Sequence, residues 1–311
     1  MLCILGPTAS GKSSLAMQLA QGEPRIELIS MDSALVYRGM DIGTAKPNRE
    51  EQARVRHHLI DLIDPTQSYS AARFVEDAAR AAQEIRGRGH IPVMVGGTML
   101  YYKAYREGLD ELPSVPQSIR DEIAQEAAAQ GWPRLHAQLM AIDPATATRL
   151  QPTDAQRISR ALELYRFTGK AMSELIAGSA KRARHDDGSR EALRVVALEP
   201  ADRALLHDRI AQRFKQMISA GLLDEVQELM NRGDLSPTLP SMRCVGYRQA
   251  WEYLQGRCTK EEFIAAGIAA TRQLAKRQIT WIRSFDDLIR LDPFASSATQ
   301  DLLAKCRALI E

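Results

Sequence analysis

The segment Gly6-Pro7-Thr8-Ala9-Ser10-Gly11-Lys12-Ser13 matches the pattern G-x-x-x-x-G-K-[ST] at every fixed position. An apolar stretch over residues 2–5 precedes it, and apolar residues at helical spacing follow it. A glycine-rich loop between a strand and a helix points its backbone N–H groups at an anion, and the helix dipole adds partial positive charge. The segment, called the phosphate loop below, therefore predicts a strand–loop–helix unit that binds phosphate. A nucleoside triphosphate and a diphosphate would satisfy the same donors.

Two side chains of the phosphate loop carry specific expectations. Lys12 would bring a mobile ammonium to terminal phosphate oxygens, and the hydroxyl of Ser13 is a candidate ligand for Mg²⁺, the cofactor that we expect. The predicted phosphate-binding residues are the whole loop: Gly6, Pro7, Thr8, Ala9, Ser10, Gly11, Lys12 and Ser13.

Further apolar runs indicate that this unit belongs to a larger sheet. Residues 26–31, 90–95, 194–198 and 288–291 have the pattern of strands, and helical patterns separate them. Strands that alternate with helices form a parallel sheet with helices on both faces. We therefore predict an α/β fold like that of P-loop NTPases.

Two polar residues follow predicted strands, where an open α/β sheet has its ligand crevice. Asp32 ends the run 26–31, and it suits a magnesium carboxylate, a general base or a helix N-cap. Thr98 follows Gly96-Gly97, whose backbone can approach a ligand closely. Its hydroxyl would lie at the same edge as the phosphate loop, although a turn with a helix cap explains this segment equally well.

Strand patterns stop between residues 113 and 185, where prolines punctuate short helical stretches. This region closes with a polar, glycine-containing stretch at 181–189, after which strands and helices alternate again. We predict one split α/β core over residues 1–112 and 186–311, with an inserted all-helical module over residues 113–185.

Composition excludes several classes of protein. With 41 basic and 39 acidic residues among 311, the net charge of +2 argues against a uniformly basic surface, although a local basic groove remains compatible with it. No apolar run approaches the ~18 residues that span a bilayer, and the five residues before Gly6 are too few for a signal peptide. The four scattered cysteines form no C-x-x-C pair, which argues against disulfides and zinc. We expect a cytoplasmic protein without membrane attachment.

Three segments concentrate polar side chains outside the phosphate loop. A helix over 156–160 places Gln156 and Arg160 one turn apart, which equally suits a solvated face. The segment 243–248 flanks a glycine with two arginines and a tyrosine, which suits phosphate contacts with a stacking partner or an ordinary loop. The segment 272–283 has a tryptophan, several basic residues and no acid, which favours an RNA-binding edge.

A further helix over 208–214 places Arg209 and Arg213 one turn apart. Arginines at this spacing can close over a diphosphate. A surface helix that forms salt bridges with Glu225 and its neighbours is the alternative. We interpret the adjacent His57 and His58 as structural residues, because neighbouring side chains diverge on any regular element.

Six motifs follow one another along almost the whole chain: G-P-T-A-S-G-K-S at 6–13, D-S-A-L-V-Y-R-G-M-D-I-G-T-A-K-P at 32–47, G-G-T-M-L-Y at 96–101, Q-R-I-S-R at 156–160, R-C-V-G-Y-R at 243–248 and R-Q-L-A-K-R-Q-I-T-W-I-R at 272–283. Together they resemble the tRNA dimethylallyltransferase family, also called tRNA isopentenyltransferases or IPP transferases. Many members carry glutamine where this chain has Leu35.

The resemblance implies transfer of a dimethylallyl group from dimethylallyl diphosphate to the N6 amine of the adenosine at position 37, beside the anticodon. The substrates would be tRNAs that read codons beginning with U, and the products N6-isopentenyladenosine and diphosphate. The alternative is a P-loop kinase of a small metabolite or nucleotide, which would turn over ATP and would need no RNA-binding segments.

The resemblance also implies roles for individual residues. Asp32 would accept the proton of the adenine amine, and Thr98 would hydrogen-bond the bridging oxygen of the breaking bond. The phosphate loop would hold the diphosphate of the donor, and Arg213 would clamp it together with Arg209. The adenosine would be flipped out of the anticodon loop, the helical module would contact tRNA and move as a hinge, and the enzyme would be a monomer. The implied tRNA-binding residues are Asp32, Ser33, Ala34, Leu35, Thr98, Gln156, Arg157, Ile158, Ser159, Arg160, Arg243, Cys244, Val245, Gly246, Tyr247, Arg248, Lys276, Arg277, Gln278, Ile279, Thr280, Trp281, Ile282 and Arg283.

Overall fold

The computed structural model describes residues 1–110, 112–183, 193–295 and 298–310. The chain forms two compact units, of which the first comprises Met1–Glu107 and Glu191–Glu311 and the second comprises Gly108–Arg190. Each unit is described by itself. Within the described ranges, no helix is long and apolar enough to cross a membrane.

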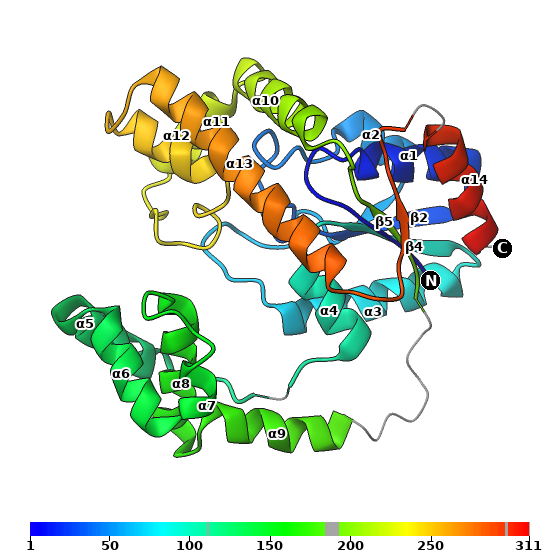
Figure 1. Cartoon of the computed structure of the whole chain (residues 1–311). Coiled ribbons are helices and arrows are strands. Elements are labelled where there is room, and N and C mark those ends of the chain that lie inside the picture. Colours follow the sequence, from blue (N-terminus) through cyan, green and yellow to red (C-terminus); the bar gives the residue numbers. More distant parts are fainter. Residues whose placement is uncertain (111, 184–192, 296–297, 311) are drawn as a thin grey trace. The chain divides into compact units, whose positions relative to one another are not determined.

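A six-stranded sheet lies at the centre of the first unit (Figure 1). All of its strands are parallel, in the order β3-β2-β4-β1-β5-β6, which confirms the predicted α/β fold. The five predicted strands are present, with bounds shifted by no more than one residue, whereas β3 was missed because it has only two residues. The strands are β1 (Leu2–Leu5), β2 (Ile26–Met31), β3 (His57–His58), β4 (Ile91–Gly96), β5 (Arg194–Leu198) and β6 (Ile289–Leu291).

Apolar residues on both sides of β1, β2, β4 and β5 explain why helices cover both faces of the sheet. Successive side chains of a strand point to opposite faces. Cys3 therefore packs into one apolar cluster with α3 and α4, while Ile4 packs into another with α1 and α14. Figure 1 shows these helix pairs on opposite sides of the strands. The helices are α1 (Lys12–Gly22), α3 (Ala71–Gly87), α4 (Met99–Glu107) and α14 (Ala298–Ile310).

Further helices of the first unit form a separate apolar cluster that extends the sheet's carboxyl edge. Phe214, Tyr247 and Phe263 lie at its centre and are almost fully buried. The longest helix, α13, begins at a capping box in which Thr259 and Glu262 satisfy each other's backbone N–H groups. The cluster is formed by α10 (Arg203–Ser219), α11 (Leu222–Asn231), α12 (Tyr247–Leu254) and α13 (Lys260–Arg283), whereas α2 (Arg49–Arg54) of the same unit has no buried residue.

The second unit contains only helices among its described residues. Its core includes Leu139 and Leu162, and the buried Asp143 caps α7 and accepts hydrogen bonds from the backbone and hydroxyl of Ser173. The polar stretch expected at 181–189 lies outside the described residues from 184 onward, and its first three residues end a helix. The helices are α5 (Gln117–Gln130), α6 (Trp132–Ile142), α7 (Pro144–Ala147), α8 (Ala155–Thr168) and α9 (Met172–Ala183).

A buried carboxylate joins β2 and β3 near the start of β4. Glu27 is 3% exposed and binds His58 at 2.6 Å, Arg88 at 2.8 Å and His90 at 2.8 Å. Burial alone would raise the pKa of Glu27, but hydrogen bonds from Arg88 and His58 outweigh it and lower the pKa from 4.5 to about 2. The ionised carboxylate therefore stabilises the fold at neutral pH, and this stabilisation disappears as pH falls from about 4.5 to about 2.

We expect Glu27→Gln to lower the free energy of unfolding at pH 7 by about 2 kcal/mol, because the Arg88 guanidinium loses its charged partner and one donor at the buried carboxylate loses its acceptor. Urea unfolding at pH 7 and at pH 3 measures the effect, and the difference from the unchanged protein should shrink at the lower pH. Glu84→Gln, on the exposed side of α3, is the matched control. An equal difference at both pH values would contradict the assignment of Glu27.

Candidate active site

The phosphate loop connects β1 to α1, as predicted, and α1 begins at Lys12. The Lys12 ammonium donates a hydrogen bond to the carbonyl of Pro7 at 3.2 Å, so the side chain folds over its own loop. Burial lowers the pKa of Lys12 to about 8; the nearby Asp32 opposes this shift and Arg213 adds to it. An arriving anion would therefore meet a desolvated cation at the amino end of a helix.

Gln278 braces the phosphate loop against the end of β4. Its side-chain oxygen accepts from the Thr8 backbone N–H at 2.8 Å, and its side-chain nitrogen donates to the carbonyl of Gly97 at 2.9 Å. A Cβ on Gly97 would lie 2.5 Å from that nitrogen, so only glycine fits this turn. The side chain of Gln278 is 9% exposed and both ends of its amide are occupied, and its expected contact with tRNA stays a prediction.

Two arginines of α10 reach the same loop in different ways. Arg209 donates to the carbonyl of Ala9 at 3.1 Å and lies over the ring of Phe294, so it supports the backbone of the loop. Arg213 lines the cavity beside the loop, where burial lowers its pKa and Asp32 opposes that shift. Among the described side chains, α10 forms no salt bridge with Glu225. The Glu225 carboxylate instead accepts hydrogen bonds from backbone N–H groups and from a tyrosine.

Asp32 and Thr98 lie next to each other because they follow neighbouring strands, in which Met31 pairs with Gly96. Asp32 accepts from the Ala34 backbone N–H at 2.8 Å, and no helix begins there, so the N-cap interpretation is wrong. The hydroxyl of Thr98 accepts from the Ser33 backbone N–H at 3.0 Å and donates to the Ser33 hydroxyl at 3.3 Å. These bonds hold the segment after β2 against the end of β4.

These groups share one cavity of about 880 Å³ in the first unit. Its volume matches a site for a ligand of drug size or larger. The predicted residues that line it are Thr8, Ala9, Lys12, Ser13, Asp32, Ser33, Ala34, Leu35, Thr98, Arg213, Arg243, Cys244, Val245, Gly246, Tyr247, Arg277, Gln278 and Trp281.

Sequence reasoning missed part of the cavity wall. The segment from Gly43 to Pro47 borders the cavity, as do Met17 on α1 and Ile60 after β3. The run D-I-G-T-A-K-P at 41–47 belongs to the motifs of the resemblance, but its sequence pattern assigns no catalytic role to any of its residues. Their importance comes from the backbone path, which the sequence pattern does not reveal.

The segment 243–248 separates into exposed and buried side chains. Arg243 and Arg248 are exposed, and Cys244 is partly exposed. Tyr247 is fully buried, and its hydroxyl donates to Glu225 at 2.5 Å. The ring packs in the apolar cluster beside the cavity, and its expected contact with tRNA stays a prediction.

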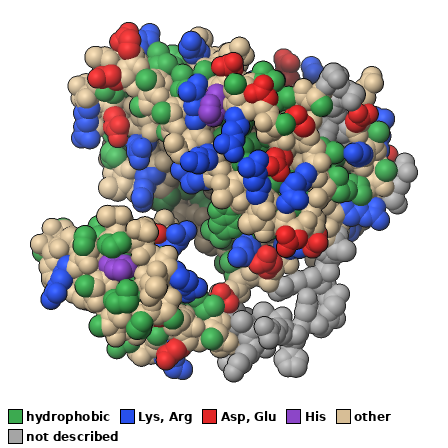
Figure 2. Space-filling view, viewed as in Figure 1, with side chains coloured by type: hydrophobic (Ala, Val, Ile, Leu, Met, Phe, Trp, Pro, Cys, Tyr) green, Lys and Arg blue, Asp and Glu red, His purple; other side chains and the backbone are tan. Residues whose placement is uncertain are grey.

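On α13 the helical period decides which predicted residues reach solvent. Lys276, Arg277, Thr280 and Arg283 are exposed and Trp281 is partly exposed, on a face of the first unit where Figure 2 shows Lys and Arg side chains gathered. Ile279 and Ile282 are buried, so the expectation that they contact tRNA is wrong.

The predicted α8 residues belong to the second unit. Gln156 and Arg157 are exposed, Ser159 and Arg160 are half-buried, and Arg157 pairs with Asp154 at 2.9 Å. Ile158 is fully buried in the core of this unit, so the expectation that it contacts tRNA is wrong.

The residues of the cavity fit Mg²⁺ as part of a ligand complex. Within the described ranges, no three His, Cys, Asp or Glu side chains cluster as a metal site. Mg²⁺ in phosphate sites takes one or two protein oxygens together with substrate oxygens and water. The hydroxyl of Ser13 and the carboxylate of Asp32 face one cavity and supply oxygens of this kind.

Known proteins are similar to this chain in sequence. A family model described as IPP transferase matches residues 35–285. The tRNA dimethylallyltransferase of Ralstonia nicotianae is 57% identical over 313 residues, covering 100% of this chain and 96% of the relative. That of Cupriavidus necator is 56% identical over 295 residues, covering 95% and 91%.

Solved structures have the same fold. The tRNA isopentenylpyrophosphate transferase of Bacillus halodurans is 34% identical with a TM-score of 0.66, covering 99% of this chain and 98% of its own. A eukaryotic dimethylallyltransferase acting on tRNA is 26% identical with a TM-score of 0.74, covering 99% and 77%. The resemblance and the P-loop type of fold are thereby confirmed, and this chain belongs to the IPP transferase family.

Proposed function

We propose that this chain transfers the dimethylallyl group of dimethylallyl diphosphate to the N6 amine of the adenosine at position 37 in tRNAs that read codons beginning with U. The products are N6-isopentenyladenosine and diphosphate. The observation that carries this proposal is one cavity that joins the phosphate loop to the carboxylate of Asp32. The N6 lone pair attacks C1 of the donor while the C1–O bond breaks, the bond pair stays on the diphosphate oxygen, and the amine proton passes to Asp32.

The donor's diphosphate lies in the phosphate loop. Lys12 and the backbone N–H groups at the start of α1 bind its oxygens, and Arg213 contacts it from α10. Ser13 would hold Mg²⁺ beside the diphosphate, and the bound ion would supply further positive charge to the leaving group. Together these groups stabilise the negative charge that develops as C1 separates from oxygen.

The acceptor adenine enters beside the ends of β2 and β4. The amine lies at Asp32, while Thr98 hydrogen-bonds the bridging oxygen of the donor. Because the amine cannot reach C1 inside a stacked anticodon loop, the base is flipped into the cavity. Leu35 and Met99, which border the cavity, exclude water from the allylic centre.

The RNA backbone is bound by basic side chains: the exposed Arg243, Arg248, Lys276, Arg277 and Arg283 of the first unit, and the exposed Arg157 and half-buried Arg160 of the helical module. Affinity for tRNA should therefore fall as salt rises. The catalytic groups named above line one cavity within the first unit, and we propose that the enzyme acts as a monomer. The free thiols of the four cysteines are compatible with the cytoplasm, where we place the reaction.

A transfer assay tests the proposal. Purified protein is incubated with an unmodified anticodon stem-loop, dimethylallyl diphosphate and Mg²⁺. In a parallel reaction, ATP replaces dimethylallyl diphosphate. Prenylation of the adenosine, absent when guanosine replaces it, is the expected result. Phosphorylation from ATP without prenyl transfer would instead indicate a kinase, which the names of the relatives do not favour.

A further inference from the structure

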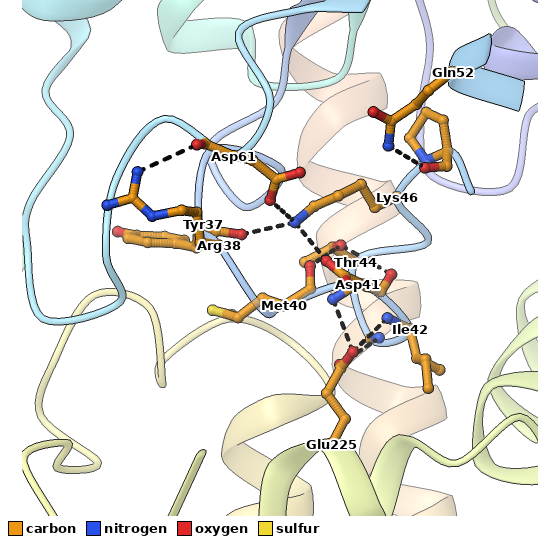
Figure 3. Close-up of polar contacts among 12 residues, drawn as sticks. Tyr37, Arg38, Met40, Asp41, Ile42, Thr44, Lys46, Gln52, Asp61 and Glu225 are labelled. Atoms are coloured by element: carbon orange, nitrogen blue, oxygen red, sulfur yellow. Dashed lines mark hydrogen bonds and ion pairs between the residues drawn. The ribbon is translucent and has the colours of Figure 1, made fainter. Parts of the chain in front are cut away.

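The loop between β2 and α2 borders the cavity at both of its ends. Residues 33–35 and 43–45 line the cavity, but the segment between them points away from it. The loop contains neither a helix nor a longer strand, and Tyr37 forms only one bridge, with Ile63. A loop of this length with no secondary structure keeps one shape only where side chains hold it. Figure 3 shows two charged side chains that do so.

Lys46 is the first of these side chains. Its side chain is 2% exposed, and its ammonium binds the Tyr37 carbonyl at 2.8 Å, Asp41 at 2.6 Å and Asp61 at 2.5 Å (Figure 3). Three acceptors match the three N–H donors of an ammonium, which removes the cost of burying it. The backbone N–H of Asp61 in turn donates to the carbonyl of Leu35 at 3.1 Å. Asp61 therefore links Lys46 by hydrogen bonds to Leu35, which lines the cavity.

Glu225 on α11 is the second charged side chain that holds the loop. Its carboxylate accepts from the backbone N–H groups of Asp41 at 2.8 Å, Ile42 at 2.7 Å and Gly43 at 3.1 Å, and from the Tyr247 hydroxyl (Figure 3). Successive backbone N–H groups that converge in this way form an anion-binding nest, here filled by the protein's own carboxylate. A Cβ on Gly43 would lie 2.5 Å from the ring of Tyr247, so glycine alone permits this approach.

We propose that Lys46 and Glu225 are positioning residues for the acceptor base, which they do not touch. Both side chains hold the loop between β2 and α2 in one shape. One end of this loop carries Ser33–Leu35, next to Asp32, and the other end carries Thr44. Among the described residues, neither the phosphate loop nor Arg213 hydrogen-bonds to Lys46 or Glu225, so the donor's diphosphate site does not depend on them. This inference rests on the proposed function, because it assigns the loop to the acceptor side of the same cavity.

The position of the acceptor amine relative to C1 determines the rate. A displacement of about 1 Å in a group that orients a substrate can cost about 10²-fold in rate. In Glu225→Gln, whichever way the amide lies, at least one backbone N–H of the loop loses its acceptor. We expect kcat/KM for the stem-loop to fall about 10²-fold, with the donor KM and the affinity for inorganic diphosphate unchanged.

Asp61→Asn is a second, milder variant, and asparagine suits the left-handed backbone of this residue, whose φ is 54°. Lys46 loses one charged acceptor, and we expect a loss of about tenfold in the same parameter. Glu228→Gln, exposed one turn further along α11, is the matched control and should behave like the unchanged protein. These variants keep the fold, which melting temperatures verify.

Transfer kinetics with varied stem-loop and varied donor, together with calorimetric titration of inorganic diphosphate, decide the matter. Loss confined to the stem-loop parameters supports the inference. Unchanged transfer in both variants, or a parallel loss of diphosphate affinity, overturns it. If the protein without any substitution transfers no prenyl group, the proposed function itself is refuted. This outcome is distinct from a failure of the inference about Lys46 and Glu225.

Discussion

Replacing Asp32 with asparagine is expected to lower kcat for prenyl transfer by about two to four orders of magnitude, while tRNA binding stays near that of the unchanged protein. Asparagine keeps the oxygen that accepts from the Ala34 backbone N–H, so the turn after β2 is retained. What it removes is the carboxylate that takes the amine proton. Single-turnover transfer to the anticodon stem-loop measures the rate, and filter binding measures the affinity.

Asp286→Asn is the control for this experiment, because Asp286 is an exposed carboxylate in the same unit and outside the cavity. It should leave both rate and affinity unchanged. If Asp32→Asn transferred at the rate of the unchanged protein, Asp32 would not be the base. If it lost tRNA affinity as strongly as rate, its role would be binding.

Lys12→Met is expected to reduce the transfer rate by about 10²- to 10³-fold, because the leaving diphosphate loses a preorganised cation. The same change should stabilise the protein without ligand. Burial lowers the pKa of Lys12 from 10.5 to about 8, and each pKa unit corresponds to about 1.4 kcal/mol, so the charged form costs up to about 3 kcal/mol at neutral pH. Urea unfolding and the transfer assay measure the two effects. A variant that is less stable would contradict the desolvation of Lys12.

The pH dependence of diphosphate binding follows from the same group. Below about pH 8 Lys12 carries the charge that diphosphate needs, and above it the charge is lost, so affinity should fall as pH rises from 8 to 9. Lys12→Arg keeps its charge over this range and serves as the control. The affinity of the arginine variant should fall less steeply. An identical slope in both proteins would show that another group titrates.

Local pattern was sufficient to predict the sheet and the phosphate loop. The apolar runs that became β1, β2 and β5 are short, buried on both sides and bounded by polar or glycine residues, which is the signature of strands in a parallel sheet. The strand β3 could not be predicted, because two histidines carry no periodicity. They extend the sheet only because β2 pairs with them.

The candidate site residues that lie buried have one feature in common. Tyr247 and Gln278 stand in polar, basic segments, and the sequence cannot tell an exposed face from a buried one where a helix begins or crosses the core. The structure turns Tyr247 toward Glu225 and Gln278 toward the phosphate loop. Their polar groups are bonded within the protein, because a buried donor or acceptor left unpaired is costly.

The sequence by itself determined the phosphate loop, the order of strands and helices, and the polar residues that end the strands, because these depend on neighbours close along the chain. Only the tertiary structure decided which of them share a cavity. Asp32 meets Thr98 because β2 and β4 are neighbours in the sheet, and the loop after Asp32 is held by Glu225, which lies 193 residues further along the chain. Contacts over such separations depend on the packing of whole elements, which no local pattern encodes.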